Sequence, residues 1–232
     1  MATRPTGATD MRRTFFLFSS RARRAGSGAA YPRQHGFSMI EILVTLIIVT
    51  VGLLGLAGLK ARAHISELES YQRAQALIMV ADMVERVRLN RVNASCFAIT
   101  TASSGAPWYG TSSAGFSSCS GGTTAQNTIA GQGLTAWDNM LNGAGETKSG
   151  VNVGAMIGAR GCVSYDSTAE ITNATSGAPM SGTGIYTVSV AWQGMADTVA
   201  NNTYKCGTGN YGTESKRRVV ATQFRIANLQ LN

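Results

Sequence analysis

The sequence predicts an α+β fold in which a long N-terminal α-helix, whose first half can span a membrane, packs on an antiparallel β-sheet. Three observations support this prediction. Residues 39–59 form one apolar run, and an amphipathic pattern continues from it without a proline to about residue 91. Three later segments carry the signals of β-strands, and in two of them apolar residues recur with the two-residue period of a strand. Because the strands follow one another after the long helix, we expect them to form a meander against it.

The apolar run is long enough to cross a bilayer once. A hydrocarbon core about 30 Å thick requires roughly 20 helical residues, and residues 39–59 contain one charged side chain, Glu41. Seven arginines and one acid, Asp10, lie in residues 1–36, so most of the formal charge of +8 precedes the run. Because the more basic flank stays in the cytoplasm, we expect everything after the run to be exported.

A cleavable secretory signal peptide is the alternative interpretation of this N-terminus, because Ala61-Arg62-Ala63 fits the A-x-A pattern of signal peptidase sites. Three features oppose it. The apolar run exceeds the usual length of about 7–15 residues, a carboxylate lies near its start, and Lys60 and Arg62 crowd the cut site.

Glu41 needs an explanation, because a carboxylate at the centre of a membrane helix costs roughly 2.5–3.5 kcal/mol. It lies in the first turns of the apolar helix, where the interface and the positive end of the helix dipole reduce that cost. A tolerated interfacial glutamate is one interpretation. The other is functional, because Gly36 precedes Phe37 and Glu41 is the fifth residue counted from that Phe.

Residues 33–44 read RQHGFSMIEILV, which resembles the cleavage signal of type IV prepilins: a basic leader, Gly, then Phe-[Ser/Thr]-[Leu/Met]-Ile-Glu and an apolar helix. The resemblance implies the type IV pilin fold. It also implies that Gly36 is the last leader residue, that Phe37 becomes an N-methylated N-terminus, and that Glu41 meets the terminal amine of a neighbouring subunit. Such a pair satisfies two charges that would each be costly alone in a low dielectric.

Residues 52–59, GLLGLAGL, further resemble the PilV family of pilus-modification minor pilins, and residues 161–165 and 190–194 are similar in kind. The resemblance implies a minor pilin that primes or joins the pilus and promotes assembly, adhesion and twitching motility. The implied partners are a prepilin peptidase and methyltransferase, other minor and major pilins, the inner-membrane assembly platform and, before assembly, membrane lipid. The implied location is the bacterial inner membrane, with the head in the periplasm, and then the surface pilus. A tip adhesin and a type II secretion pseudopilin remain alternatives.

Three glycines, Gly52, Gly55 and Gly58, lie three residues apart in the apolar run, where each lowers helix stability by up to about 1 kcal/mol relative to Ala. They either permit close helix packing in the membrane or allow this stretch to unwind when the subunit enters a filament. Both interpretations stay open.

These observations divide the chain into a cytoplasmic leader (residues 1–36), a membrane or filament half of the long helix (37–59), an amphipathic half (60–93) and an α+β head (94–232). The amphipathic half is expected to lay an apolar stripe on the head. The stripe residues are Ile65, Leu68, Tyr71, Leu77, Val80, Ala81, Val84 and Val87. The charges expected to be exposed are Glu67, Glu69, Arg73, Asp82 and Arg86.

The first part of the head, residues 94–133, is rich in Gly, Ser, Thr and Ala and is expected to be loop-rich. Four cysteines in an exported head are expected to form disulfides. Of the three connectivities we favour the sequential one, Cys96 with Cys119 and Cys162 with Cys206. The first of these bridges would close a short loop and stabilise it by roughly 2–4 kcal/mol.

A short helix is predicted over residues 133–141, with Thr135 as its N-cap, Gly143 near its end and Trp137 in the core. Strands are predicted over residues 162–165, 185–192 and 218–226. The strands are close enough in sequence to form an antiparallel meander on the long helix. Residues 198–213 would form a long loop tethered by Cys206.

Catalytic chemistry is poorly supported by the sequence. Its two histidines are His35 in the leader and His64 beside the membrane segment, so a nucleophile in the head has no base. No C-x-x-C or H-x-x-x-H spacing and no acidic calcium loop occurs. We therefore expect no catalytic residue, no metal and no cofactor, and a protein that is not an enzyme.

Nucleic acid is not an expected partner. Once residues 1–36 are removed, the chain is close to neutral and has little electrostatic attraction to phosphates. The basic cluster in the exported part is Lys216, Arg217 and Arg218. It could contact DNA, but a solvated entrance to the last strand is the simpler interpretation.

Overall fold

The structure is a computed structural model that describes residues 36–154 and 156–227. The predicted leader lies outside the described residues, except for Gly36. The chain forms two compact units that divide after Thr50. The predicted boundaries at residues 59 and 93 remain predictions.

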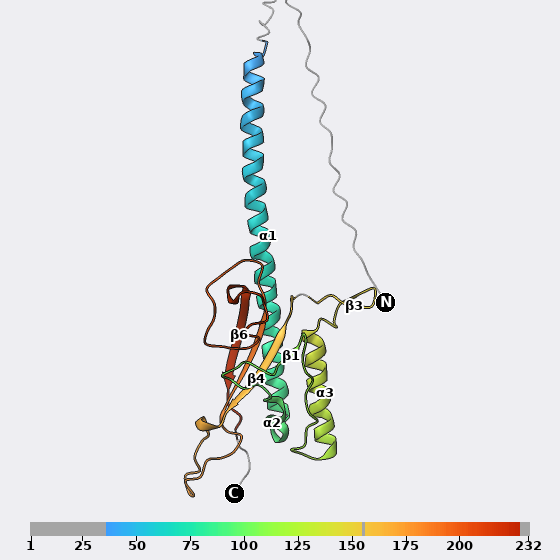
Figure 1. Ribbon diagram of the computed structural model, residues 1–232, viewed down its shortest axis with the longest axis vertical. Helices are drawn as coiled ribbons and strands as arrows, with labels where there is room; N and C mark the ends of the chain where they lie inside the picture. Colours follow the sequence, from blue (N-terminus) through green and yellow to red (C-terminus); the bar gives the residue numbers. More distant parts are fainter. Residues whose placement is uncertain (1–35, 155, 228–232) are drawn as a thin grey trace, which may run out of the picture. The chain divides into compact units, whose positions relative to one another are not determined.

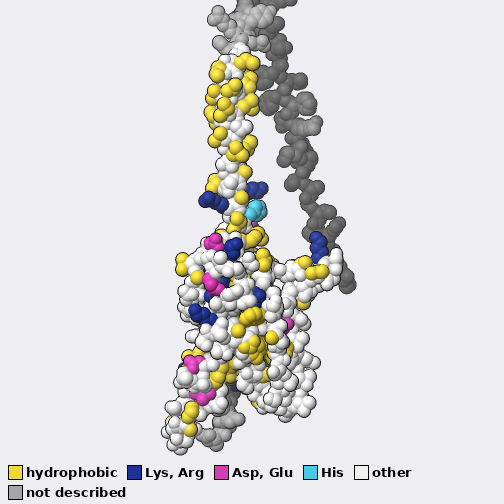
Figure 2. All heavy atoms as spheres, viewed as in Figure 1, with side chains coloured by type: hydrophobic (Ala, Val, Ile, Leu, Met, Phe, Trp, Pro, Cys, Tyr) yellow, Lys and Arg dark blue, Asp and Glu magenta, His cyan; other side chains and the backbone are white. Residues whose placement is uncertain are grey.

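Helix α1, Met39–Leu89, is the longest element (Figure 1). A 3-10 turn, η1 (Arg91–Asn93), and a short helix, α2 (Ala94–Phe97), follow it. The prediction of one helix to about residue 91 is therefore confirmed to within two residues. Every residue from 39 to 59 is exposed, and Figure 2 shows hydrophobic side chains around this first part of the helix.

The main sheet has four strands in the order β1-β4-β5-β6, and all neighbours are antiparallel. Its strands are β1 (Tyr109–Gly110), β4 (Arg160–Asp166), β5 (Ile185–Gln193) and β6 (Arg217–Phe224). The last three form the predicted meander. A separate hairpin joins β2 (Thr147–Lys148) to β3 (Val151–Asn152). The head also contains two 3-10 turns, η2 (Ser167–Ala169) and η3 (Glu214–Lys216).

Helix α3, Thr124–Leu141, is twice as long as the helix predicted in this region, and the predicted N-cap is wrong. The N-cap is Thr123, which forms a capping box with Gln126. Thr135 lies inside the helix, where its hydroxyl donates to the Gly131 carbonyl. The loop-rich prediction for residues 94–133 is therefore only partly correct.

Tertiary packing explains why α3 forms despite glycines at positions 131 and 133. Its buried residues fall on one face with helical spacing, and they are Ala130, Leu134, Trp137 and Leu141. This face packs on α1, where the Trp137 indole N–H donates to the Met79 carbonyl at 3.0 Å. The prediction that Trp137 lies in the core is confirmed.

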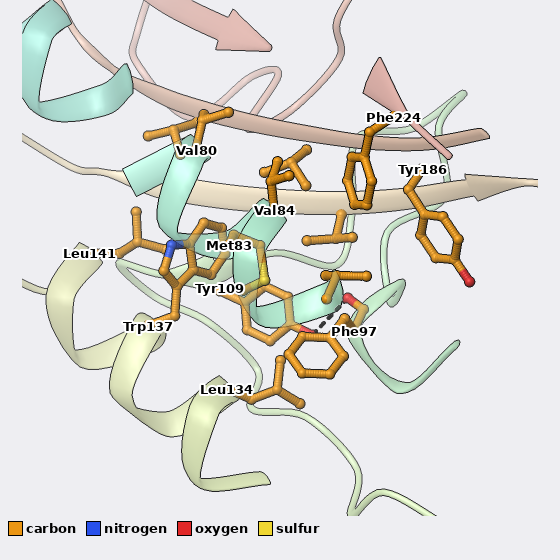
Figure 3. Packing of buried hydrophobic residues seen from close by; sticks show 14 of the residues in the cluster. Val80, Met83, Val84, Phe97, Tyr109, Leu134, Trp137, Leu141, Tyr186 and Phe224 are labelled. Atoms are coloured by element: carbon orange, nitrogen blue, oxygen red, sulfur yellow. Dashed lines mark hydrogen bonds between the residues drawn. The ribbon is translucent and has the colours of Figure 1, made fainter. Parts of the chain in front are cut away.

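The core of the head lies between α1, α3 and one face of the sheet (Figure 3). The Tyr109 ring meets the Trp137 ring edge to face, with centroids 5.4 Å apart, and its hydroxyl donates to the Phe97 carbonyl. A Cβ atom at Gly161 would overlap the Trp137 ring. Glycine is therefore needed at this point of β4 because helix and strand approach so closely.

The apolar stripe of α1 reaches the core only from Gln72 onwards. The buried residues of the helix are Gln72, Ala76, Val80, Met83, Val84 and Val87. Of the predicted stripe, Val80, Val84 and Val87 are buried, whereas Ile65, Leu68, Tyr71, Leu77 and Ala81 are exposed. That part of the prediction is wrong, because periodicity identifies an apolar face but not how far the head extends along it.

Two disulfides tie the loops of the head, with Cα atoms 5.4 Å apart for Cys96–Cys119 and 5.7 Å apart for Cys162–Cys206. The second joins β4 to the loop between β5 and β6. Around it, Ala191 and Tyr211 form a second buried cluster on the outer face of the sheet. Both faces of β5 are therefore buried over part of its length.

Candidate functional site at the start of the long helix

The predicted processing and assembly residues, Gly36, Phe37 and Glu41, lie together at the beginning of α1. Ser38 caps the helix, because its Oγ accepts a hydrogen bond from the Ile40 N–H at 3.3 Å and its carbonyl accepts one from the Glu41 N–H at 3.0 Å. Glu41 is thereby held in the first turn. A carboxylate at this end is favoured by the unpaired N–H groups of the helix.

The bond between Gly36 and Phe37 precedes the helix in non-helical chain. Gly36 is exposed, and a Cβ added to it would meet nothing within 4 Å. The Phe37 residue is 80% exposed. This segment therefore has the open surroundings that a cleavage site requires.

Glu41 forms no ion pair with any cation of residues 36–154 and 156–227. It is exposed on a helix that is long and apolar enough to cross a membrane. Because a carboxylate in an apolar surrounding is seldom kept without a partner, this arrangement can accept a cation from outside the chain.

The comparisons with known proteins agree with this site. Residues 31–57 match the family model of the prokaryotic N-terminal methylation motif. No curated protein and no solved structure matches the chain. The motif supports a type IV pilin-like protein, a component of a pilus or pseudopilus, and the α+β arrangement of α1 on an antiparallel sheet is that of a type IV pilin.

The motif also bears on processing and on the class of protein. It implies cleavage by a prepilin peptidase and assembly with other pilins, and it points to a structural protein rather than an enzyme. Together with the apolar helix it fits a membrane-anchored pilin. Within the described ranges, no three His, Cys, Asp or Glu side chains gather as a metal site would require.

The interpretation of Lys216, Arg217 and Arg218 as a solvated cluster is wrong for the two arginines. Arg217 is 2% exposed; its Nε donates to Glu214 Oε2 at 2.6 Å and its Nη1 to the Tyr204 carbonyl at 2.8 Å. Arg218 lies half-buried against Glu69. Both guanidinium groups form hydrogen bonds with the loop between β5 and β6, so few of their N–H groups are available to bind a phosphate.

Glu69 makes structural contacts that the sequence did not reveal. Its Oε1 accepts hydrogen bonds from the N–H groups of Met195 and Ala196, at 3.0 and 3.1 Å, and from Arg218 Nη2 at 3.0 Å. Burial would raise the pKa of this carboxyl, but the hydrogen bonds and the Arg218 charge outweigh it and lower the pKa. Glu69 therefore joins α1 to the β5–β6 loop, and no local signal links residues 149 positions apart.

Proposed function

We propose that the chain is a minor type IV pilin of the PilV type, which enters or primes the pilus and promotes its assembly, and thereby adhesion and twitching motility. The observation that carries the proposal is the prepilin motif placed at the start of an exposed apolar helix whose Glu41 has no cation within the described chain. The resemblance of residues 52–59 to pilus-modification minor pilins favours the minor role.

In this proposal, a prepilin peptidase cuts after Gly36 and methylates the new N-terminus at Phe37. The chain then waits in the inner membrane with its head in the periplasm, where lipid covers residues 39–59. The assembly platform transfers it to the growing pilus beside other minor and major pilins. There, Glu41 pairs with the terminal amine of a neighbouring subunit, and the pair stabilises the register of the two helices.

The test is to delete the gene, count surface pili by electron microscopy, and complement the strain with variants. Wild type should restore piliation, whereas Glu41→Ala and Gly36→Glu should not. Glu67→Gln is the matched control, because Glu67 lies on the same helix with its side chain 80% exposed. Normal pilus numbers in the deletion strain would refute the assembly role. Defective protein secretion with normal piliation would assign the chain to a type II secretion system instead.

A further inference from the structure

A small polar hollow lies on the outer face of the sheet, away from α1. It has a volume of about 200 Å³ and is lined by residues of β4, β5 and β6 and of the loops near positions 102 and 204. Strand register explains why polar residues meet here, because Ser164 lies opposite Thr187 and Thr187 lies opposite Gln223. These positions alternate with the core-facing Val163 and Val188.

The hollow is held in shape by covalent and backbone contacts. The Cys162–Cys206 disulfide forms part of its lining and ties the β5–β6 loop to β4. The two loops also touch, because the Gly207 N–H donates to the Gly105 carbonyl and a Cβ at Gly105 would overlap the Lys205 backbone. A ligand would therefore meet a site that needs little ordering before binding.

Two serine hydroxyls in the hollow are free to bind a ligand. Ser189 lines it although this residue is only 5% exposed. In residues 36–154 and 156–227 neither its hydroxyl nor that of Ser164 makes a hydrogen bond, while Thr187 accepts one from Gln223 Nε2 at 3.3 Å. Hydroxyls that make no hydrogen bond within the chain can donate to and accept from the polar groups of a ligand in the hollow.

The charge in the hollow is positive. Lys205 is the charged residue of the lining, and no carboxylate of the described chain lies within ion-pair distance of it. The nearby Glu214 is held by the Arg217 guanidinium and the Gly209 N–H. Tyr204, the neighbour of Lys205 in the chain, is a half-buried residue of the same lining.

We propose that this hollow binds a single sugar ring that carries a carboxylate. Hydroxyl and amide side chains are suited to the sugar hydroxyls, and Lys205 is suited to the carboxylate. The volume is below the roughly 300–1,000 Å³ of pockets for drug-sized ligands, which restricts the occupant to about one ring. The site goes beyond the proposed function, since binding is measured on purified protein and does not depend on pilus assembly.

The experiment titrates the full chain, purified in detergent micelles, with glucuronate and with neutral methyl glucoside by calorimetry. Glucuronate should bind at least tenfold more tightly than the glucoside. Lys205→Met should weaken glucuronate binding at least tenfold, and Ser189→Val should abolish it. Lys148→Met on the β2–β3 hairpin is the matched control and should bind like wild type.

Three results would overturn the proposal: no glucuronate binding by wild type, equal binding by Lys205→Met, or equally good competition by acetate. A thermal melt of each variant shows whether it is folded. If Ser189→Val does not fold, Gln223→Leu takes its place, because Gln223 is exposed and its loss leaves the core unchanged. A folded Gln223→Leu variant with wild-type affinity would also contradict the proposal.

Discussion

Residues 39–59 of α1 and the head that follows differ in where their apolar side chains lie. In the first region these side chains are exposed from residue 39 to residue 59, with values such as 65% for Ile48 and 73% for Leu54. In the head, Trp137, Tyr109 and Val188 are fully buried. The first region therefore depends on lipid or on other subunits for its apolar contacts, whereas the head contains its own core.

This difference indicates that substitutions in the two regions should affect different properties. A change in the head should alter its free energy of unfolding, and a change in the first half of α1 should alter membrane insertion or assembly. The four predictions that follow test this separation, from the largest expected effect to the smallest.

Trp137→Ala should cost about 3–5 kcal/mol of unfolding free energy, because it leaves a cavity in the core and the Met79 carbonyl loses its donor. The expected result is a large fall in the melting temperature of the head, measured by circular dichroism. Ile129→Ala on the same helix is the control, because Ile129 is 58% exposed and should change stability by less than about 0.5 kcal/mol. Equal losses for both variants would contradict the packing of α3.

Ile48→Asp should weaken membrane insertion by about 2.5–3.5 kcal/mol, since it places a carboxylate near the middle of the apolar run. Carbonate extraction of cell membranes measures the fraction inserted, and Ile48→Leu serves as the control. The melting temperature of the head should stay unchanged, as Ile48 lies outside the core cluster. A head that melts earlier would mean that the two regions are energetically coupled.

Glu69→Gln should destabilise the head by about 1–2 kcal/mol at pH 7, because the charge-assisted hydrogen bond from Arg218 is lost. The loss is limited to this size because the Glu69 side chain is 27% exposed and water screens its charge. Glu67→Gln is the control and should have a negligible effect.

The pH dependence of this effect follows from the lowered pKa of Glu69. A carboxyl whose pKa is lowered by folding stabilises the folded state above its unfolded value, near 4.5, and loses that contribution as the pH falls through the folded value. The stability difference between wild type and Glu69→Gln should therefore shrink below about pH 4.5. Denaturant titrations at pH 7 and at acidic pH measure it, and a difference that grows in acid would refute the ion pair.

Thr123→Ala should cost about 1 kcal/mol, because Thr123 caps α3. Thr135→Ala is a sharp comparison, as Thr135 is the cap that the sequence predicts and the structure places inside the helix. Alanine has the higher helix propensity there, so Thr135→Ala should be neutral or slightly stabilising. A larger loss of stability for Thr135→Ala than for Thr123→Ala in thermal melts would contradict the longer helix and support the predicted helix over residues 133–141.

The sequence alone predicted the features that depend on local pattern. The apolar run, the long helix, the three long strands and the prepilin motif all lie in continuous segments whose composition or period identifies them. Thr123 and Gln126 also form a local capping-box signal, but the surrounding Gly, Ser and Thr residues favoured a loop. The two-residue β1 carries no readable period, so only its pairing with β4 identifies it.

Contacts between distant residues were decided by the tertiary structure. Glu69 and Arg218 are each ordinary surface charges in sequence, and folding alone brings them within 3.0 Å. The same holds for the polar hollow, whose lining comes from three strands and two loops. The sequence by itself thus determined the class of this protein, because the prepilin motif lies in one continuous stretch of chain. Only the tertiary structure decided which charges are buried and which hydroxyls converge, because those properties depend on strand register and loop closure rather than on neighbours in sequence.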